Sequence, residues 1–337
     1  MKRPNIKTVA NRAGVSTATV SRVLANFEGV RNDTRDKVLS VIEELDYSVD
    51  TVARSLRQKK TDTIGLIVGN VLSPFYSIIA KSIEDTARES GYKMILCNGD
   101  DDPEKELEYL KVLRSNKVDG IILTPTGLNQ DFISSTLKAG IDMVFLDRLI
   151  DGIDGDAVLV DNYKGSYNAT GYLIKRGYKK IAIISGFTDR TTGRERLKGY
   201  SMALKDSGIK EDSSLVKIGN FKKESGISLT KELLSADNRP EAIFVTNIDM
   251  ALGSLIVLKE NGIKVPDDMA IISFDDPEWA TINDPPLTAV AQPVYQLGKN
   301  AAEKLISKIR HKDSSGSENK PSIDTLSTSL IIRKSVK

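Results

Sequence analysis

Apolar residues recur at helical spacing three times within the first 45 residues of the chain. This spacing predicts three short helices, over residues 6–13, 17–25 and 33–45. The third helix is expected to bury a stripe formed by Val38, Leu39, Ile42 and Leu45. Asn5 and Ser16 are suited to cap the first two helices, and Gly14 between them tolerates positive φ. Two short helices joined by a tight turn and braced by a third form a helix-turn-helix pattern.

From residue 61 onward, short apolar runs are separated by amphipathic stretches of helical length. Continuous apolar strands that alternate with helices indicate parallel sheets covered on both faces. About four strand–helix units precede residue 160 and about four follow it. We therefore predict an α/β body of two similar lobes, each a doubly wound parallel sheet. A polar loop over 311–321 and a final strand near 326–332 complete the expected elements.

The composition argues against several classes of chemistry. The only cysteine, Cys97, excludes an intramolecular disulfide and any multi-cysteine metal site. The only histidine, His311, lies in a polar stretch, and we interpret it as a surface residue rather than part of a catalytic triad or metal centre. Neither a Walker A sequence nor a Gly-x-Gly-x-x-Gly follows any predicted strand. We therefore predict no catalytic residues, no metal, no cofactor and no enzyme activity.

Charge is distributed unevenly along the chain. Residues 1–60 contain twelve Lys and Arg and seven Asp and Glu, a net charge of +5, although the whole chain carries only +2. The rest of the chain is therefore mildly acidic, and a basic head on an acidic body fits a polyanion-binding head. The alternative is that the five excess charges form an ordinary solvated face. The apolar runs are too short to span a bilayer, and the N-terminus leads into no signal-peptide core. We expect a cytoplasmic protein with no membrane contact.

A series of motifs extends from the head to the end of the body. They are Val9-Ala10, Ala13-Gly14-Val15-Ser16, Thr19-Val20-Ser21-Arg22-Val23-Leu24, Thr34-Arg35, Leu45-Asp46-Tyr47, Ala53-Arg54-Ser55-Leu56, Ile64-Gly65-Leu66-Ile67-Val68, Asp119-Gly120-Ile121-Ile122, Asp161-Asn162, Ser273-Phe274-Asp275-Asp276 and Pro286-Leu287-Thr288-Ala289-Val290-Ala291-Gln292-Pro293. Together they resemble the lactose/galactose repressor (LacI/GalR) family of bacterial transcription factors. The resemblance covers the whole chain and implies a body similar to periplasmic sugar-binding proteins, with a ligand at the carboxyl ends of the strands.

The resemblance also implies domain boundaries and partners. The expected parts are a helix-turn-helix head at 1–48, a hinge helix and linker at 49–61, a first lobe at 62–161 plus 292–321, and a second lobe at 162–291 plus 322–337. The chain would cross between the lobes near Asp161-Asn162, near Ala291 and just after Pro321. The implied function is a repressor of carbohydrate-utilisation genes that binds a palindromic operator as a homodimer and is modulated by a small, ribose-like sugar.

By the same resemblance, the second helix enters the major groove of DNA. Thr17, Ala18 and Arg22 occupy the positions that read bases, and a guanidinium can bond to two acceptors of one guanine. Ser16, Ser21, Asn26 and Tyr47 match positions that contact phosphates. The alternative for Thr17 and Ala18 is that they are ordinary residues on a helix surface.

The hinge adds two candidate DNA contacts. Arg54 belongs to a basic segment, and within that segment Leu56 matches the leucine that the family inserts into the minor groove to kink DNA. A leucine packed against the body is the alternative for Leu56. Val49-Asp50 stands where the family usually has Pro-Asn; Asp50 can cap a short helix, but its carboxylate would repel phosphates. A helix of about eight residues is unstable in isolation, so we expect it to form only when docked.

Polar and aromatic residues at strand ends match the effector site of the family. They are Ser73, Phe75, Tyr76, Asp147, Arg148, Arg196, Asn247, Asp275 and Gln292, with Trp279 as a further stacking face. This set resembles ribose-type binding proteins and suits a neutral polyhydroxyl ligand, whose hydroxyls donate and accept. Ser73 stands where an asparagine is usual, and Asp249 comes one residue later than the family's aspartate, so we interpret Asp249 as structural. Any single member of the set could instead form a surface ion pair.

Two other functional classes compete with a ligand-responsive repressor. An enzyme on a Rossmann-like fold would need a phosphate-cradling loop, and none is visible. A sugar-transport protein would need a signal peptide and would have no use for a basic head. Salt-dependent binding to a palindromic DNA would separate the three, because neither alternative should show it.

Overall fold

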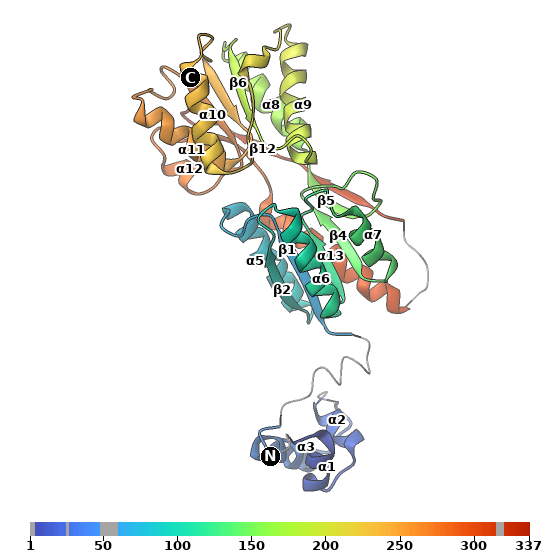
Figure 1. The fold of residues 1–337 in the computed structure, drawn as a ribbon. Helices are drawn as coiled ribbons and strands as arrows, with labels where there is room; N and C mark the ends of the chain where they lie inside the picture. Colours follow the sequence, from blue (N-terminus) through green and yellow to red (C-terminus); the bar gives the residue numbers. More distant parts are fainter. Residues whose placement is uncertain (1–3, 25–26, 48–59, 315–319) are drawn as a thin grey trace. The chain divides into compact units, whose positions relative to one another are not determined.

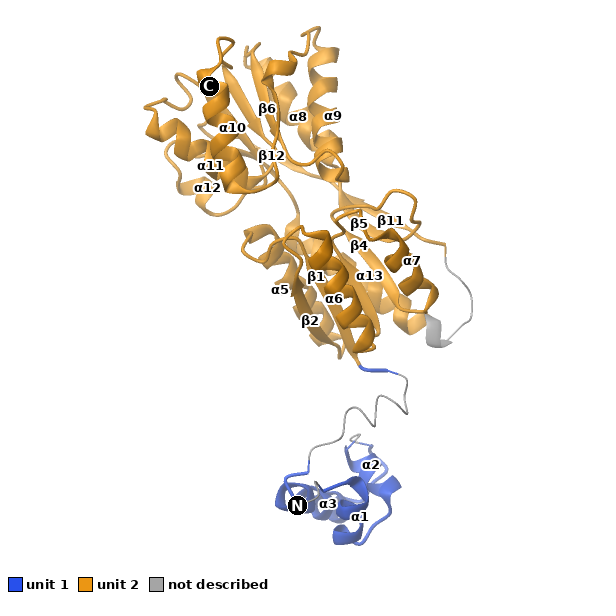
Figure 2. Ribbon diagram, viewed as in Figure 1, with its two compact units in different colours: residues 1–61 blue, residues 62–337 orange. Residues whose placement is uncertain are grey.

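The computed structural model describes residues 4–24, 27–47, 60–314 and 320–337 (Figure 1). The chain forms two compact units, Met1–Thr61 and Asp62–Lys337 (Figure 2). The predicted hinge helix, including Arg54 and Leu56, lies outside the described residues.

The first unit contains the helices α1 (Ile6–Ala13), α2 (Thr17–Leu24) and α3 (Asn32–Glu44). The first helix has the predicted bounds, because the Asn5 side chain accepts a hydrogen bond from the backbone N–H of Thr8 at its start and Gly14 ends it at φ 65°. Ser16 accepts a hydrogen bond from the backbone N–H of Thr19 and so caps α2. The predicted helix-turn-helix pattern is present.

The core of the first unit is small and aliphatic. Its buried residues are Val9, Ala10, Ala13, Val20, Val23, Val38 and Val41. The prediction that Leu39 belongs to the buried stripe of α3 was wrong, since its exposed fraction is 46%. The helical period explains the error, because Val38, Val41, Ile42 and Leu45 follow the i, i+3, i+4, i+7 spacing of one face and Leu39 does not.

The second unit consists of two lobes. The first lobe contains β1 (Thr63–Val68), α5 (Pro74–Glu89), β2 (Lys93–Asn98), α6 (Pro103–Ser115), β3 (Gly120–Leu123), α7 (Gln130–Lys138), β4 (Asp142–Leu146), β5 (Asp156–Val160), α13 (Val294–Ser314) and β11 (Ile323–Leu326). Its strands form one parallel sheet in the order β11-β5-β4-β3-β1-β2.

The second lobe repeats this plan. It contains α8 (Asn162–Lys175), β6 (Ile181–Ser185), α9 (Thr191–Asp206), the 3-10 turn η1 (Ser213–Leu215), β7 (Val216–Ile218), α10 (Lys223–Ser235), β8 (Ala242–Val245), α11 (Ile248–Glu260), β9 (Ala270–Phe274), α12 (Trp279–Ile282), β10 (Thr288–Ala291) and β12 (Ser329–Ile331). The sheet order is β12-β10-β9-β8-β6-β7, and only β12 runs antiparallel to its neighbour among the described strands.

Each sheet has a hydrophobic core on both faces. In β1, Leu66 faces the core shared with α5 and α13, whereas Ile67 faces the core on the opposite face. In β6, Ile184 and Ile183 divide in the same way between the two cores of the second lobe. Successive side chains of a strand point to opposite faces, so a strand covered on both sides must be apolar throughout. The predicted doubly wound α/β fold is confirmed.

The chain passes between the lobes at three places (Figure 1). The first two crossings come directly after β5 and β10. The prediction that the third comes just after Pro321 was wrong. The chain first adds β11 to the sheet of the first lobe and crosses only at Ser327-Thr328 before β12. The expected single strand over 326–332 is therefore two short strands in different sheets, because these polar residues interrupt the apolar pattern at that point.

The polar stretch that begins at His311 was expected to be a loop, but α13 continues through it to Ser314. Leu305 and Ile309 are buried in the core of the first lobe and extend the helical pattern up to that point. His311 itself is exposed on this last turn of α13.

Candidate functional site

A cleft of about 840 Å³ lies between the two lobes, within the usual range for small-molecule sites. Its walls come from the segments that follow the carboxyl ends of strands in both sheets. Nine of the ten sequence-predicted effector residues line it: Ser73, Phe75, Tyr76, Asp147, Arg148, Arg196, Asn247, Asp275 and Gln292. Residues from distant parts of the chain thus meet at one place, as expected for a doubly wound fold.

Trp279 does not belong to this group. It is the first residue of α12, and its half-buried indole packs against the core of the second lobe that contains Ala280 and Leu287. The prediction of a stacking face at Trp279 is corrected accordingly. A large apolar ring is stabilised more by this packing than by exposure in a polar cleft.

The cleft wall of the first lobe is centred on Arg148. Asp147 follows β4 with φ 67°, and Arg148 comes next. The Arg148 guanidinium forms an ion pair with Asp101, donates to the Tyr76 hydroxyl at 3.1 Å, and has its Nε 3.5 Å from Oδ2 of Asp147. Burial opposes the charged form, but the neighbouring Tyr76, Asp101 and Asp147 raise the pKa of Arg148. The guanidinium is therefore a fixed positive charge in the cleft.

Two other groups of this wall have pKa values that reflect burial. Burial raises the pKa of Tyr76 well above its ordinary value, so the phenol stays protonated. Burial also raises the pKa of the Asp147 carboxyl, and the neighbouring Arg148 and Arg196 oppose that increase. The wall is thus a dense set of buried polar groups whose charges partly neutralise one another.

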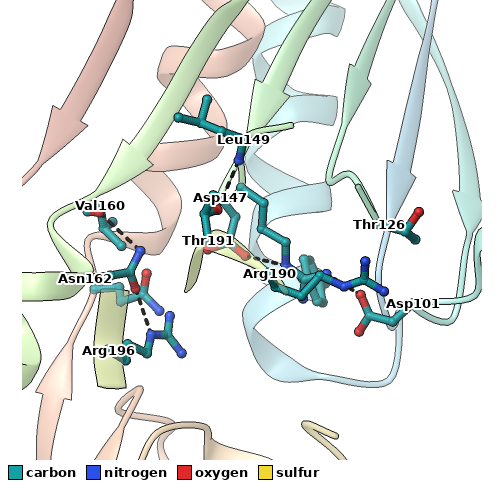
Figure 3. A network of polar contacts seen from close by, with 12 residues as sticks. Asp101, Thr126, Asp147, Leu149, Val160, Asn162, Arg190, Thr191 and Arg196 are labelled. Atoms are coloured by element: carbon teal, nitrogen blue, oxygen red, sulfur yellow. Dashed lines mark hydrogen bonds and ion pairs between the residues drawn. The ribbon is translucent and has the colours of Figure 1, made fainter. Parts of the chain in front are cut away.

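Arg196 on α9 is the corresponding group of the second lobe. Its Nε donates to Oδ1 of Asn162 at 2.7 Å (Figure 3). Its Nη1 donates to the backbone carbonyl of Thr246 at 2.6 Å. The guanidinium carbon lies 3.8 Å from the ring centroid of Phe274. Burial lowers the pKa of Arg196, and Asp275 and Asp147 counteract that effect. Asn162 is the first residue of α8 and directly follows the first crossing between the lobes. Its hydrogen bond with Arg196 therefore connects the cleft to that crossing.

Asp275 follows β9 with φ 76°, in the same position relative to its strand as Asp147. It accepts a hydrogen bond from the Gln292 side-chain amide, which follows β10 at the second crossing. Burial raises the pKa of the Asp275 carboxyl, and Arg196 is the principal group that lowers it. The two aspartates with left-handed backbone therefore bring carboxylates into the cleft from both lobes.

Ser73 and Asp249 form a contact between the lobes. The Ser73 hydroxyl lies near the Asp249 carboxyl; burial raises the pKa of this carboxyl, and Ser73 opposes that increase. Asp249 lines the cleft, so its interpretation as purely structural was incomplete. Asn247 instead has a structural task, because its Oδ1 caps α11 by accepting from the backbone N–H of Met250 at 2.9 Å.

Two further contacts join the lobes. The backbone N–H of Leu149 in the first lobe donates to the Thr191 hydroxyl of the second at 3.1 Å (Figure 3). Arg194 and Asp151 form a more exposed ion pair nearby, with a shortest distance of 3.1 Å. These contacts join the start of α9 to the loop that follows β4.

Aromatic rings supply apolar surface on both sides of the cleft. Phe75 packs edge-on against Tyr76 in the first lobe, and Phe187 packs edge-on against Phe221 in the second. The Phe221 ring centroid lies 5.5 Å from the guanidinium carbon of Arg148. Several lining residues that follow strand ends were not predicted from the sequence: Asp101 after β2, Phe187 and Thr192 after β6, and Asn220 and Phe221 after β7. Applying the strand-end rule after β2 and β6, whose apolar runs are visible in the sequence, would have found Asp101, Phe187 and Thr192, whereas β7 has no comparable run.

Four buried polar atoms at the cleft have no hydrogen-bond partner within the described residues. Two are acceptors, Oδ1 of Asp147 and Oε1 of Gln292. Nε of Arg148 is a donor, and the hydroxyl of Thr192 can donate or accept. Buried polar groups are normally satisfied, so this set marks a place where a ligand with donors and acceptors can bind. In the parts of the chain that the structure describes, no group of His, Cys, Asp and Glu could hold a metal ion.

The candidate nucleic-acid interface lies on the first unit. Ser16, Thr17, Ala18 and Arg22 are exposed, Ser21 is half-buried, and Tyr47 is half-buried against the small aliphatic core. Arg22 lies in the last turn of α2, and Thr17 and Ala18 begin the helix, so all three are available on its surface. Asn26, Arg54 and Leu56 lie outside the described residues. No described helix is both long and apolar enough to cross a membrane.

Two family models match the chain. Residues 5–50 match the model of bacterial regulatory proteins of the lacI family, and residues 61–328 match that of periplasmic binding proteins and the sugar-binding domain of the LacI family. The chain is 38% identical over 335 residues to the HTH-type transcriptional repressor PurR of Haemophilus influenzae (strain PittEE), covering 98% of each chain. It is 37% identical to the HTH-type transcriptional regulator RegA of Clostridium saccharobutylicum, covering 92% of this chain and 93% of that protein.

Solved structures show the same architecture. A lac repressor dimer bound to operator and the anti-inducer ONPF has 26% identity and a TM-score of 0.86, with 99% of each chain covered. A complex of the transcriptional regulator CelR with cellobiose has 31% identity and a TM-score of 0.75, covering 99% of this chain and 100% of that one. A regulator from Enterococcus faecium with bound ribose has 29% identity and a TM-score of 0.72, covering 81% of this chain and 98% of that one.

Proposed function

Because this chain belongs to the lacI family of bacterial regulatory proteins and is a DNA-binding transcriptional repressor, we propose that a small neutral sugar in its cleft controls its binding to DNA. A ribose-like monosaccharide is the favoured effector, and carbohydrate-utilisation genes are the expected targets. The protein acts as a homodimer on a palindromic operator. Its relatives are transcriptional regulators, and the cleft serves binding rather than catalysis.

The unpartnered polar atoms of the cleft carry this proposal. Oδ1 of Asp147 and Oε1 of Gln292 need donors, while Nε of Arg148 needs an acceptor. Each hydroxyl of a sugar offers both a donor and an acceptor, so neighbouring hydroxyls on one ring can satisfy such a mixed set. Leaving a buried polar group unsatisfied costs about 1–3 kcal/mol, which favours a ligand of this kind over an apolar one.

The charges of the cleft favour a neutral ligand. Each arginine already faces carboxylates, Arg148 by its contacts with Asp101 and Asp147 and Arg196 by its attraction to Asp275. A ligand with a phosphate or carboxylate group would also meet Asp249 and would be repelled. The aromatic rings, by contrast, suit the apolar C–H faces of a sugar ring. The solved regulators with bound ribose and with cellobiose lend support by similarity.

Ligand binding would act by changing the relative positions of the two lobes. A sugar that bonds to Asp147 and Arg148 from one lobe and Asp275 from the other binds a closed cleft more tightly than an open one, and only such a difference shifts the population. Residues 49–61 would transmit the change to the DNA-binding head. Formation or loss of the short hinge helix would then set the affinity for DNA.

The effector is tested by thermal unfolding of the whole protein with a panel of compounds. D-ribose, related pentoses and hexoses, ribose 5-phosphate and adenine serve as probes. We expect a neutral monosaccharide to stabilise the protein by about 2.7 kcal/mol at 100 times its dissociation constant, with no effect of ribose 5-phosphate. Stabilisation by adenine or the phosphorylated sugar, with none by neutral sugars, would contradict the proposed effector class.

The DNA-binding proposal is tested by selecting the preferred palindrome from a random library. Arg22→Ala should weaken binding to that palindrome by about 1–3 kcal/mol and relax the preference at one symmetric base pair. The guanidinium is the strongest base-reading group on the exposed face of α2. An unchanged preference in a base-substitution panel would remove Arg22 as a reader, and a 1:1 complex of one chain per palindrome would contradict the homodimer.

A further inference from the structure

The exposed ring of Phe27 lies next to the Arg22 side chain. The guanidinium carbon of Arg22 is 6.0 Å from the Phe27 ring centroid, at the outer limit of an attractive cation–π contact. We propose that Phe27 positions Arg22 for base recognition and is thereby a specificity-determining residue of the DNA-binding head. This inference rests on the proposed reading of a base by Arg22.

Three contacts fix the place of Phe27. Its backbone N–H donates to the carbonyl of Arg22 at 3.0 Å, which ties it to the end of α2. Its carbonyl accepts from Nη2 of Arg35 on α3 at 2.8 Å. The ring lies close over Gly29, where an added Cβ would come within 2.5 Å of Cε1. The ring is thus bounded by Gly29, and its backbone is held by both α2 and α3.

The ring is not needed to complete the core of the head. Its exposed fraction is 56%, and the buried cluster of the first unit forms from aliphatic residues of the three helices. A single exposed aromatic residue has no meaning by itself. Its fixed backbone and its place beside the one arginine expected to read a base give this residue a specific role.

The physical consequence is a restriction of a flexible side chain. A free arginine side chain has about 2 kcal/mol of rotamer entropy, part of which is lost when it binds a base. A ring that restricts the movement of the guanidinium before DNA binds reduces the entropy lost on binding. It also favours one orientation of the guanidinium toward the base. Phosphate contacts made elsewhere on the head do not depend on this restriction, so the effect should fall on specific rather than non-specific binding.

A double-mutant cycle on the full-length protein tests the proposal, with the selected palindrome and a random duplex as DNA probes. Phe27→Leu should weaken binding to the palindrome by about three- to fivefold, as expected for an exposed cation–π contact, and leave the random duplex unaffected. In an Arg22→Ala background the same change should have no further effect. Phe27→Tyr should retain the wild-type affinity, because it keeps the ring.

Leu39→Ala is the matched control, since Leu39 is also an exposed apolar residue of the head and should not alter base preference. If Phe27→Leu reduced the affinity for the palindrome equally in the wild-type and Arg22→Ala backgrounds, the positioning role would be overturned. That result would indicate direct contact of the ring with DNA. A gain in affinity would overturn it too, since the ring would then hold Arg22 away from the base. An Arg22→Ala variant with unchanged base preference would instead refute the reading by Arg22, on which the inference depends.

Discussion

Replacement of Asp275 by asparagine tests the cleft with little change in shape. The carboxylate accepts a hydrogen bond from Gln292, and the Oδ1 of an asparagine can accept the same bond. The substitution removes a negative charge that faces Arg196 and turns one acceptor into a donor. We therefore expect weaker effector binding in a protein that still folds and still binds operator.

The magnitude follows from the strength of the lost bond. Hydrogen bonds to charged groups contribute about 1.5–3 kcal/mol and neutral ones about 0.5–1.5 kcal/mol, so the exchange should cost about 1.4 kcal/mol of binding energy. This is about a tenfold increase in the dissociation constant. At a sugar concentration 100 times the wild-type dissociation constant, stabilisation should fall from about 2.7 to about 1.4 kcal/mol.

Stability without ligand should change little. Burial raises the pKa of Asp275 in the folded protein, so its contribution to stability is largest at low pH and is lost as the pH rises through that value. At neutral pH the buried charge therefore carries a penalty, and the asparagine removes it. The attraction between Asp275 and Arg196 is lost at the same time. These two effects on the free energy of unfolding have opposite signs.

The assay is thermal unfolding over a series of sugar concentrations, combined with operator binding in the same series. Asp276→Asn is the matched control, because this neighbouring carboxylate pairs with Arg333 at 2.6 and 2.8 Å instead of lining the cleft. It should lower stability without ligand and leave the sugar response unchanged. If Asp275→Asn responded to the sugar with the midpoint concentration and amplitude of the wild type, the assignment of the cleft as the effector site would be refuted.

Three further predictions concern the body. Burial raises the pKa of Cys97 to about 11, so at pH 8 the thiol should react with Ellman's reagent only as the protein unfolds in urea. Glu106 is buried and accepts three hydrogen bonds, so Glu106→Ala should lower the free energy of unfolding in urea by about 2–4 kcal/mol by leaving their donors unpaired. Gly193→Ala should lower the melting temperature, because its Cβ would come within 2.1 Å of the Phe187 carbonyl, whereas Gly171→Ala in an open part of α8 should raise it.

The sequence predicted the lobes and most of the cleft because both depend on local signals. Long apolar strands separated by helices specify a parallel sheet, and such a sheet brings the ends of its strands together. Nine of the ten residues that the resemblance places in the effector site line the cleft, and most of them follow strands with strong apolar runs. Phe221 was missed because it follows β7, a strand of three residues at the edge of its sheet with no comparable run.

The remaining errors concern choices that tertiary packing makes. Nothing in the local pattern shows that Trp279 turns toward the core of its own lobe, since indole rings occur both in cores and against the faces of sugars. The segment after Pro321 is weakly patterned, and only pairing with β5 and then β10 divides it between two sheets. Ser73 and Asp249 approach each other although they are far apart in the chain, so no spacing rule could reveal their proximity.

The late position of the third crossing has a consequence for synthesis of the chain on the ribosome. The core of the first lobe includes Leu297, Ala301 and Leu305 of α13, and its sheet ends with β11, so this lobe lacks essential parts until the second has been almost entirely translated. The sheet of the second lobe is likewise incomplete until β12 has been translated. Only the helical head has all of its core residues early, and domains fold from the N-terminus as they emerge. A nascent chain stalled before residue 294 would therefore carry a folded head and two incomplete lobes. Both lobes of the body can complete their folds only after the last part of the chain has been translated.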